Sequence, residues 1–165
     1  MGLFTAKAQI VIAFNSGYTT LRPVSLNLDS DSYAIGRASN EIEFGGGNEK
    51  LIRQRIEKEV AANPMQVKSI LNGQRELQNI PAVYITPHNV HDKKIVFAPY
   101  IVSVSRDIGF ISYFKNIKKY RITVGGSASR IRLNGSIYNK NDSLFLEDGC
   151  KLADGDNVFE ITFRY

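Results

Sequence analysis

Two histidines in the segment HNVH are the residues whose types and spacing most directly suggest metal chemistry. His88 and His91 are three residues apart, a spacing that on a helix places two rings beside one metal ion. Pro87 and the Asn and Asp residues around them favour a loop instead, and no acidic or third ligand is clearly placed to complete a metal site. We therefore expect two solvent-exposed loop histidines and no metal site.

Two further groups of residues have types that bind ions. The segment GGGNEK at 45–50 resembles a glycine-rich entry to a helix, where backbone N–H groups attract anions, but it lacks the lysine spacing of a nucleotide-binding loop. A flexible joint is the alternative. Acidic residues that could hold calcium gather in the C-terminal turns, namely Asp142, Glu147, Asp148, Asp154 and Asp156. The preference of Asp for turns explains them equally well.

No set of residues in the chain forms a recognisable catalytic motif. The sequence contains neither a G-x-S-x-G nucleophile motif nor a G-x-x-x-x-G-K-[ST] phosphate loop. The single cysteine, Cys150, excludes an internal disulfide and a cysteine-based zinc cluster. We therefore predict a protein that is not an enzyme and needs no cofactor.

The composition predicts one folded domain spanning 1–165. Its hydrophobic content of 43% is too high for a disordered chain. No apolar run approaches the roughly 18 residues of a membrane helix, and residues 1–9 lack the features of a secretory signal, so we expect no membrane partner. The single cysteine makes a reducing cytoplasm the simplest location. The net charge of +5 favours acidic partners such as phosphopeptides or nucleic acid, although a charge of this size also serves solubility alone.

Alternation of apolar and polar residues predicts a mainly β chain. Phe159, Ile161 and Phe163 alternate with polar residues, as in a strand with one buried face. Other runs rich in β-branched and aromatic residues have the same character. They are 8–15, 21–28, 32–37, 40–44, 82–86, 95–105, 109–114 and 119–124.

Residues 45–95 have a different character from the segments on either side. Three glycines at 45–47 are followed by Ile52, Ile56 and Val60, whose spacing of four predicts an amphipathic helix that ends before Pro64. A shorter helix then extends to residue 71. We therefore predict a β-sandwich with a helical insertion at 45–95.

Four segments of the chain resemble, in the correct order, motifs of the forkhead-associated (FHA) domain family. SYAIGRASNEIEF at 32–44 resembles the opening Gly-Arg loop and the strand after it, and SVSRDIGFISY at 103–113 resembles the Ser-Arg-x-His segment. LNGSIYNK at 133–140 resembles Asn-Gly-Thr-x-x-Asn-Gly, and KLADGDNVFEI at 151–161 resembles the closing strand pair. The resemblance implies an FHA-like two-sheet β-sandwich.

The same resemblance implies that loops at one end of the sandwich bind phosphothreonine in a partner protein. A phosphoryl group brings nearly two negative charges and three acceptor oxygens. The positions that match the family are Arg37, Ser105, Arg106, Asn134 and Ser136. By this resemblance the two arginines and the Ser105 hydroxyl would contact the phosphate. Asn134 would hold the partner backbone, and Ser136 replaces the family threonine.

The chain departs from the family pattern at several positions. Ile108 stands where the family has a supporting histidine, Lys140 replaces a glycine, and Arg132 replaces a serine. The stretch between Arg37 and Ser105 is also much longer than usual. Each matched residue has a plain structural explanation too, such as a hairpin turn at Asn134-Gly135.

Three functions follow from these observations. The first is a non-catalytic protein-interaction module with an FHA-like fold, which acts as a scaffold or structural component of a larger complex. The second is an adaptor that binds a phosphothreonine-containing partner. The third, nucleic-acid binding through a basic surface, has FKNIKKYR at 114–121 as its candidate segment, for which the solvated face of a strand is the alternative.

Overall fold

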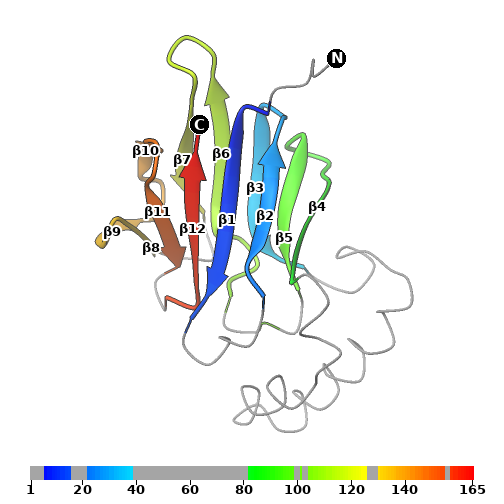
Figure 1. Cartoon of the computed structure of the whole chain (residues 1–165). Helices are drawn as coiled ribbons and strands as arrows, with labels where there is room; N and C mark the ends of the chain where they lie inside the picture. Colours follow the sequence, from blue (N-terminus) through cyan, green and yellow to red (C-terminus); the bar gives the residue numbers. More distant parts are fainter. Residues whose placement is uncertain are drawn as a thin grey trace, which may run out of the picture.

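The computed structural model describes residues 6–15, 22–38, 82–98, 101, 104–125, 130–154 and 157–165. These residues form two six-stranded β-sheets that pack face to face (Figure 1). Sheet A has the strand order β2-β1-β12-β11-β8-β9, and sheet B has the order β10-β7-β6-β3-β5-β4. The predicted mainly β, two-sheet sandwich is therefore confirmed.

Sheet A is antiparallel throughout, and its centre is the pair of β1 and β12. Ile10, Ile12 and Phe14 of β1 face the core. They pair with the buried residues Phe163, Ile161 and Phe159 of β12. The alternation of apolar and polar residues in β12 therefore predicts its buried side chains correctly. The strands of sheet A are β1 (Ala8–Phe14), β2 (Val24–Leu28), β8 (Arg130–Leu133), β9 (Ser136–Asn139), β11 (Lys151–Asp154) and β12 (Phe159–Arg164).

Sheet B is mixed, because β3 pairs parallel with β5 on one side and antiparallel with β6 on the other. Ile35, Ile95 and Ile111 lie buried on its inner face. The strands of sheet B are β3 (Ser32–Arg37), β4 (Val83–Pro87), β5 (Lys93–Phe97), β6 (Gly109–Phe114), β7 (Lys119–Val124) and β10 (Ser143–Phe145).

The position of β4 and β5 corrects the predicted insertion. Both strands lie largely within 45–95, yet they pair with each other and, through β5, with β3, so residues 83–95 belong to the sandwich. The predicted helices at 48–71 and the predicted strand at 40–44 lie outside the described residues. Within the described ranges the elements are all strands, and no helix there is long and apolar enough to cross a membrane.

The sandwich has two distinct ends, which the core contacts define. At the Arg37 end, Phe97 of sheet B packs against Phe14 and Phe159 of sheet A, with ring centroids 6.3 and 4.4 Å apart. This end is the lower one in Figure 1. At the opposite end, which we call the hairpin end, the Tyr165 hydroxyl accepts a hydrogen bond from the Tyr120 backbone N–H at 2.9 Å. The turn between β6 and β7 lies at this second end.

Candidate interaction site

The Arg37 end brings together three of the residues predicted from the sequence. The Arg37 backbone N–H donates to the Ser105 carbonyl at 3.0 Å, and its Nε donates to the Val104 carbonyl at 2.8 Å. Arg37 and Ser105 are half-buried and Arg106 is exposed. Both Arg37 contacts use backbone carbonyls of the 104–105 segment, and arginine is a side chain that suits an anionic group such as a phosphoryl or a carboxylate.

Gly36 allows the 104–108 segment to lie directly against β3. A Cβ atom at this position would lie 2.0 Å from the Arg106 carbonyl oxygen and 2.6 Å from its carbon. No side chain fits there without moving the backbone. The glycine of the Gly-Arg pair is therefore required by the close approach of two backbone segments.

Ile108 stands at the position where the resemblance predicts a histidine. Its side chain is completely buried in the core. Its backbone N–H donates to the Ile35 carbonyl at 2.9 Å, and its carbonyl accepts from the Gly125 N–H at 2.7 Å. The position is held by packing and backbone hydrogen bonds, and it offers no hydrogen-bonding side chain to the residues nearby.

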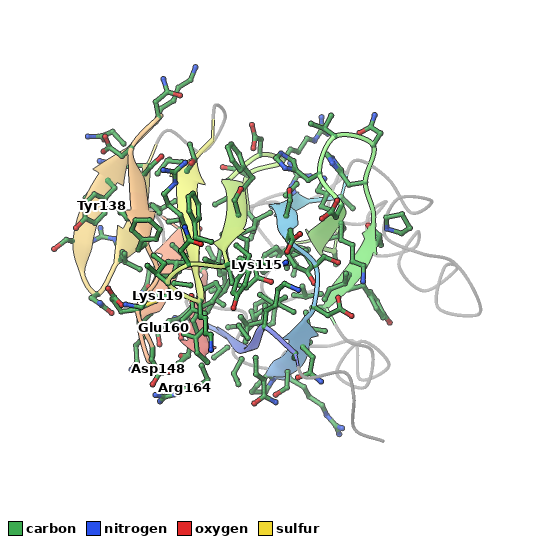
Figure 2. The ribbon with its side chains drawn as sticks, turned by 90° about the horizontal axis from the view of Figure 1, so that it is seen from above. Lys115, Lys119, Tyr138, Asp148, Glu160 and Arg164 are labelled. Atoms are coloured by element: carbon green, nitrogen blue, oxygen red, sulfur yellow. The ribbon has the colours of Figure 1, made fainter. Side chains whose placement is uncertain are left out.

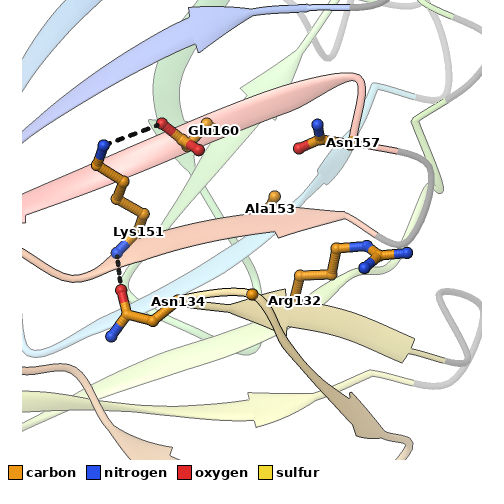
Figure 3. A pocket seen from close by; sticks show the side chains of 7 residues that line it. Arg132, Asn134, Lys151, Ala153, Asn157 and Glu160 are labelled. Atoms are coloured by element: carbon orange, nitrogen blue, oxygen red, sulfur yellow. Dashed lines mark hydrogen bonds and ion pairs between the residues drawn. The ribbon is translucent and has the colours of Figure 1, made fainter.

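Asn134 and Gly135 form the tight turn between β8 and β9. Both have positive φ, 51° and 88°, as in the hairpin turns that favour Asn-Gly. The Asn134 N–H donates to the Lys151 carbonyl at 2.9 Å, and its Oδ1 accepts from the Lys151 N–H at 3.0 Å (Figure 3). Ser136 begins β9 and is exposed. This turn therefore locks β8 to β11.

The strand pairing places this turn away from Arg37. Lys151, the partner of Asn134, begins β11, whereas Asp154 at the other end of β11 pairs with Ile131 and receives the backbone N–H of Phe159. Phe159 belongs to the Arg37 end. The predicted residues thus form two groups: the structure brings Arg37, Ser105 and Arg106 together and places Asn134 and Ser136 toward the other end of β8.

A polar groove of about 490 Å³ lies beside the Asn134 turn on the outer face of sheet A. Its floor is hollowed at Ala153, whose small side chain is flanked by longer ones (Figure 3). Lys151 and Glu160 form an ion pair across it at 3.9 Å. The remaining lining residues are Arg132, Asn134, Gly135 and Asn157.

His88 and His91 lie in the turn between β4 and β5, as predicted, but they are half-buried. The His91 ring stacks on Phe110 at 4.7 Å, and its Nδ1 lies 2.6 Å from the Ser32 hydroxyl. They line a hollow of about 440 Å³ that also reaches Arg106. This hollow could not be predicted from the sequence, because Phe110 gives no local sign that the 88–91 turn lies against its ring. No group of three metal-binding side chains occurs in the described ranges.

The acidic residues of the C-terminal turns have structural partners. Asp142 accepts from the Asn139 N–H at 2.8 Å, Asp148 from the Tyr165 N–H at 2.9 Å, and Asp154 from the Val158 N–H at 2.8 Å. Glu147 pairs with Lys119. Turn chemistry therefore accounts for Asp142 and Asp154, a longer-range hydrogen bond for Asp148 and an ion pair for Glu147. Asp156 lies outside the described residues.

Cys150 is buried with 4% exposure, and burial raises the pKa of its thiol from 9.0 to about 11. The neutral thiol is a poor nucleophile, so labelling by a disulfide reagent at pH 8 is expected to be much slower in the native protein than in urea. Because folding favours the protonated thiol, its stabilising effect is present below pH 9 and is lost as pH rises toward 11. Equal labelling rates in the native and denatured protein would contradict this environment.

Comparison with known proteins shows the fold. No protein-family model and no curated protein matches the sequence. The structure is similar to the crystal structure of full-length yeast Pml1p, with a TM-score of 0.51 and 15% identity over 95% of this chain and 80% of that one. It is similarly related to the yeast Pml1 splicing factor structure that describes integration into the RES complex, with a TM-score of 0.51 and 14% identity over 95% and 78% of the two chains.

The FHA domain of an Arabidopsis thaliana hypothetical protein also matches, with a TM-score of 0.47 and 14% identity over 100% of this chain and 90% of that one. At these identities a likeness concerns the fold alone. The mainly β, two-sheet sandwich predicted from the sequence is confirmed as the fold class, and it is similar to the fold of Pml1p.

Asn134→Ala is expected to destabilise the protein by about 1–2 kcal/mol, because alanine disfavours positive φ and the Lys151 N–H loses its acceptor. Urea denaturation measures the change. Asn134→Gly keeps the turn geometry and is expected to cost less. If the turn is only structural, ligand binding at the Arg37 end stays unchanged in both variants.

Proposed function

We propose that the protein is a non-catalytic protein-protein interaction module that acts as a scaffold or structural component of a larger complex. The observation that carries this proposal is the separation of its two groups of polar residues. Arg37, Ser105 and Arg106 lie at one end of the sandwich, and the Asn134 turn lies toward the other, beside a groove that runs along β11 to Asn157. A rigid body that presents separate polar surfaces is suited to hold several proteins together.

The fold comparison supports the same proposal. Yeast Pml1, which shares the fold, is a splicing factor that is integrated into the RES complex. An assembly role for this chain is consistent with that precedent. The cytoplasmic location expected from the sequence stays part of the proposal and rests on the lone buried Cys150.

An adaptor that binds a phosphothreonine-containing partner is the second candidate. The proximity of Arg37 to the segment that carries Ser105 and Arg106 favours it, because charge-assisted hydrogen bonds to phosphate are strong. The position of Asn134 weakens it, because the partner backbone would lose the side chain expected to hold it. The first candidate requires no phosphate, and this difference separates the two.

Titration with a phosphothreonine peptide library tests the two candidates. The adaptor predicts binding that disappears with the unphosphorylated peptides and weakens by about tenfold or more in Arg106→Ala, because a hydrogen bond to a charged group contributes about 1.5–3 kcal/mol. The exposed Arg106 is a better choice than Arg37, whose Nε supports the fold. Lys140→Ala is a matched exposed control. Absence of binding to every phosphopeptide would exclude the adaptor and leave the scaffold.

A further inference from the structure

The β6–β7 hairpin extends past the neighbouring strands at the hairpin end (Figure 1). Figure 2 looks down on this end and labels Lys115 and Lys119. Phe114 pairs with Lys119 at the last rung of the hairpin, and four turn residues lie beyond it. The outer face of β7 and the adjoining β10 continue from this tip. We call the following residues the hairpin strip: Lys115, Ile117, Lys118, Lys119, Arg121 and Phe145.

The hairpin strip carries more positive than negative charge. Lys115 and Lys118 are exposed, and Lys119 forms an ion pair with Glu147. The Arg121 guanidinium lies over the Phe114 ring, 4.8 Å from its centroid. In the part of the chain that the structure describes, no acidic side chain pairs with Lys115, Lys118 or Arg121, and the buried Nε of Arg121 has no hydrogen-bond acceptor. The charge of these three residues is therefore uncompensated by a described acidic side chain, which favours an acidic partner.

The same strip exposes large apolar side chains. Ile117 at the tip is 47% exposed and Phe145 on β10 is 40% exposed. Phe145 packs edge-on against Phe114, with centroids 5.3 Å apart, so its position is fixed by contact with the hairpin. Apolar groups held in place beside unpaired cations are typical of the centre of a protein interface, where rigid aromatic and aliphatic anchors are surrounded by polar residues.

The backbone of the tip also departs from what stability alone favours. Lys118 has a φ of 54°, in the left-handed region that costs a residue with a side chain about 1 kcal/mol relative to glycine. A glycine or asparagine would close this turn at lower cost. The strain holds an exposed lysine in the turn of the hairpin, next to Ile117.

We propose that the hairpin strip is a second docking surface, which binds an acidic protein segment containing large apolar residues. The charge of Lys115, Lys118 and Arg121 is complementary to carboxylates, and Ile117 and Phe145 provide the apolar contacts. This surface lies at the opposite end from Arg37, so it serves a partner other than the one bound there. It does not depend on phosphate.

Nucleic acid is the other polyanion that such a strip could attract, and the geometry favours it less. Bases bind single-strand sites by stacking on open aromatic faces. Arg121 lies over the Phe114 ring, which also contacts Phe145, and Ile117 has no ring to offer. Among the residues of the strip, Phe145 alone presents an exposed ring, which is fewer than the successive stacking platforms of a single-strand site. An apolar side chain of a protein segment can pack against the exposed Ile117, whereas a base cannot stack on it.

Fluorescence anisotropy with a labelled peptide in which Asp and Glu alternate with Leu and Phe tests the proposal. The peptide is expected to bind at low salt, more weakly as salt rises, and a peptide with Asn and Gln in place of the acids is expected to bind much more weakly. Lys115→Glu combined with Lys118→Glu is expected to lower the affinity at least about tenfold, because each reversal replaces an attraction by a repulsion. Ile117→Ser is expected to lower it about threefold.

Arg22→Glu combined with Lys140→Glu is the matched control, because both residues are exposed and the change in net charge is identical. Its affinity is expected to stay within about twofold of the wild type. Phosphopeptide binding at the Arg37 end, if present, should be unchanged in the Lys115→Glu/Lys118→Glu variant. The proposal is overturned if the acidic peptide fails to bind, if the hairpin variant binds as well as the control, or if oligouridylate RNA binds the strip more tightly than the peptide.

Discussion

Gly36→Ala is expected to lower the free energy of unfolding by about 3 kcal/mol, as forced overpacking against backbone does. The new Cβ would lie 2.0 Å from the Arg106 carbonyl oxygen and 2.6 Å from its carbon. These are backbone atoms, so no side chain can rotate to make room. Urea denaturation followed by circular dichroism measures the loss.

The same substitution is expected to disrupt the interaction site. The 104–108 segment must move away from β3, which breaks the hydrogen bond from the Arg37 N–H to the Ser105 carbonyl. Any partner that binds at the Arg37 end should then be lost, while the hairpin strip keeps its affinity in a variant that still folds. Gly135→Ala is the control: its φ is 88° and nothing lies within 4 Å of its Cβ position, so it should cost about 1 kcal/mol. Equal losses in the two variants would contradict the close approach at Gly36.

Phe97→Ala is expected to destabilise the protein by about 3–5 kcal/mol, as truncation of a buried aromatic side chain does. Phe97 is completely buried and connects the sheets, because its ring contacts Phe14 of β1 and Phe159 of β12. The cavity would open between the two layers at the Arg37 end. Thermal and urea denaturation measure the change.

Phe97→Leu is the control for this prediction. Leucine fills most of the same volume, so its cost is expected to be smaller by about half or more. A loss below about 1 kcal/mol for Phe97→Ala would show that Phe97 does not hold the two sheets together, and the description of the core would then be incorrect.

Many strands could be predicted from the sequence, because apolar residues that recur at every second position also lie on the buried face of a strand. Phe159, Ile161 and Phe163 of β12 are buried and Arg164 is exposed, as the alternation indicates. The role of β5 could not be predicted in this way. Four of its five residues are buried, including Lys94, so the strand shows no alternation, and its parallel pairing with β3 depends on a chain segment far away in the sequence.

The candidate site was also predicted only in part, because local motifs do not fix long-range strand pairing. The resemblance placed Arg37 and Ser105 in one site, and they are neighbours in the structure. For Asn134 the local motif was ambiguous, because Asn-Gly is both the family motif and a common hairpin turn. The end of the sandwich at which Asn134 lies depends on the pairing of β8 with β11. This pairing joins segments that are far apart in the sequence, so a short local motif does not predict it.

The most direct test of the interaction-module proposal is quantitative affinity capture from an extract of the protein's own cells, with and without phosphatase treatment of the extract. The baits are the wild type, Arg106→Ala, the Lys115→Glu/Lys118→Glu variant and the Arg22→Glu/Lys140→Glu control. We predict that the wild type and the control retain the same proteins, that these survive phosphatase treatment, and that each site variant loses a different subset. Loss of the whole set after phosphatase treatment would favour the phosphothreonine adaptor, and identical sets for all four baits would contradict both docking surfaces.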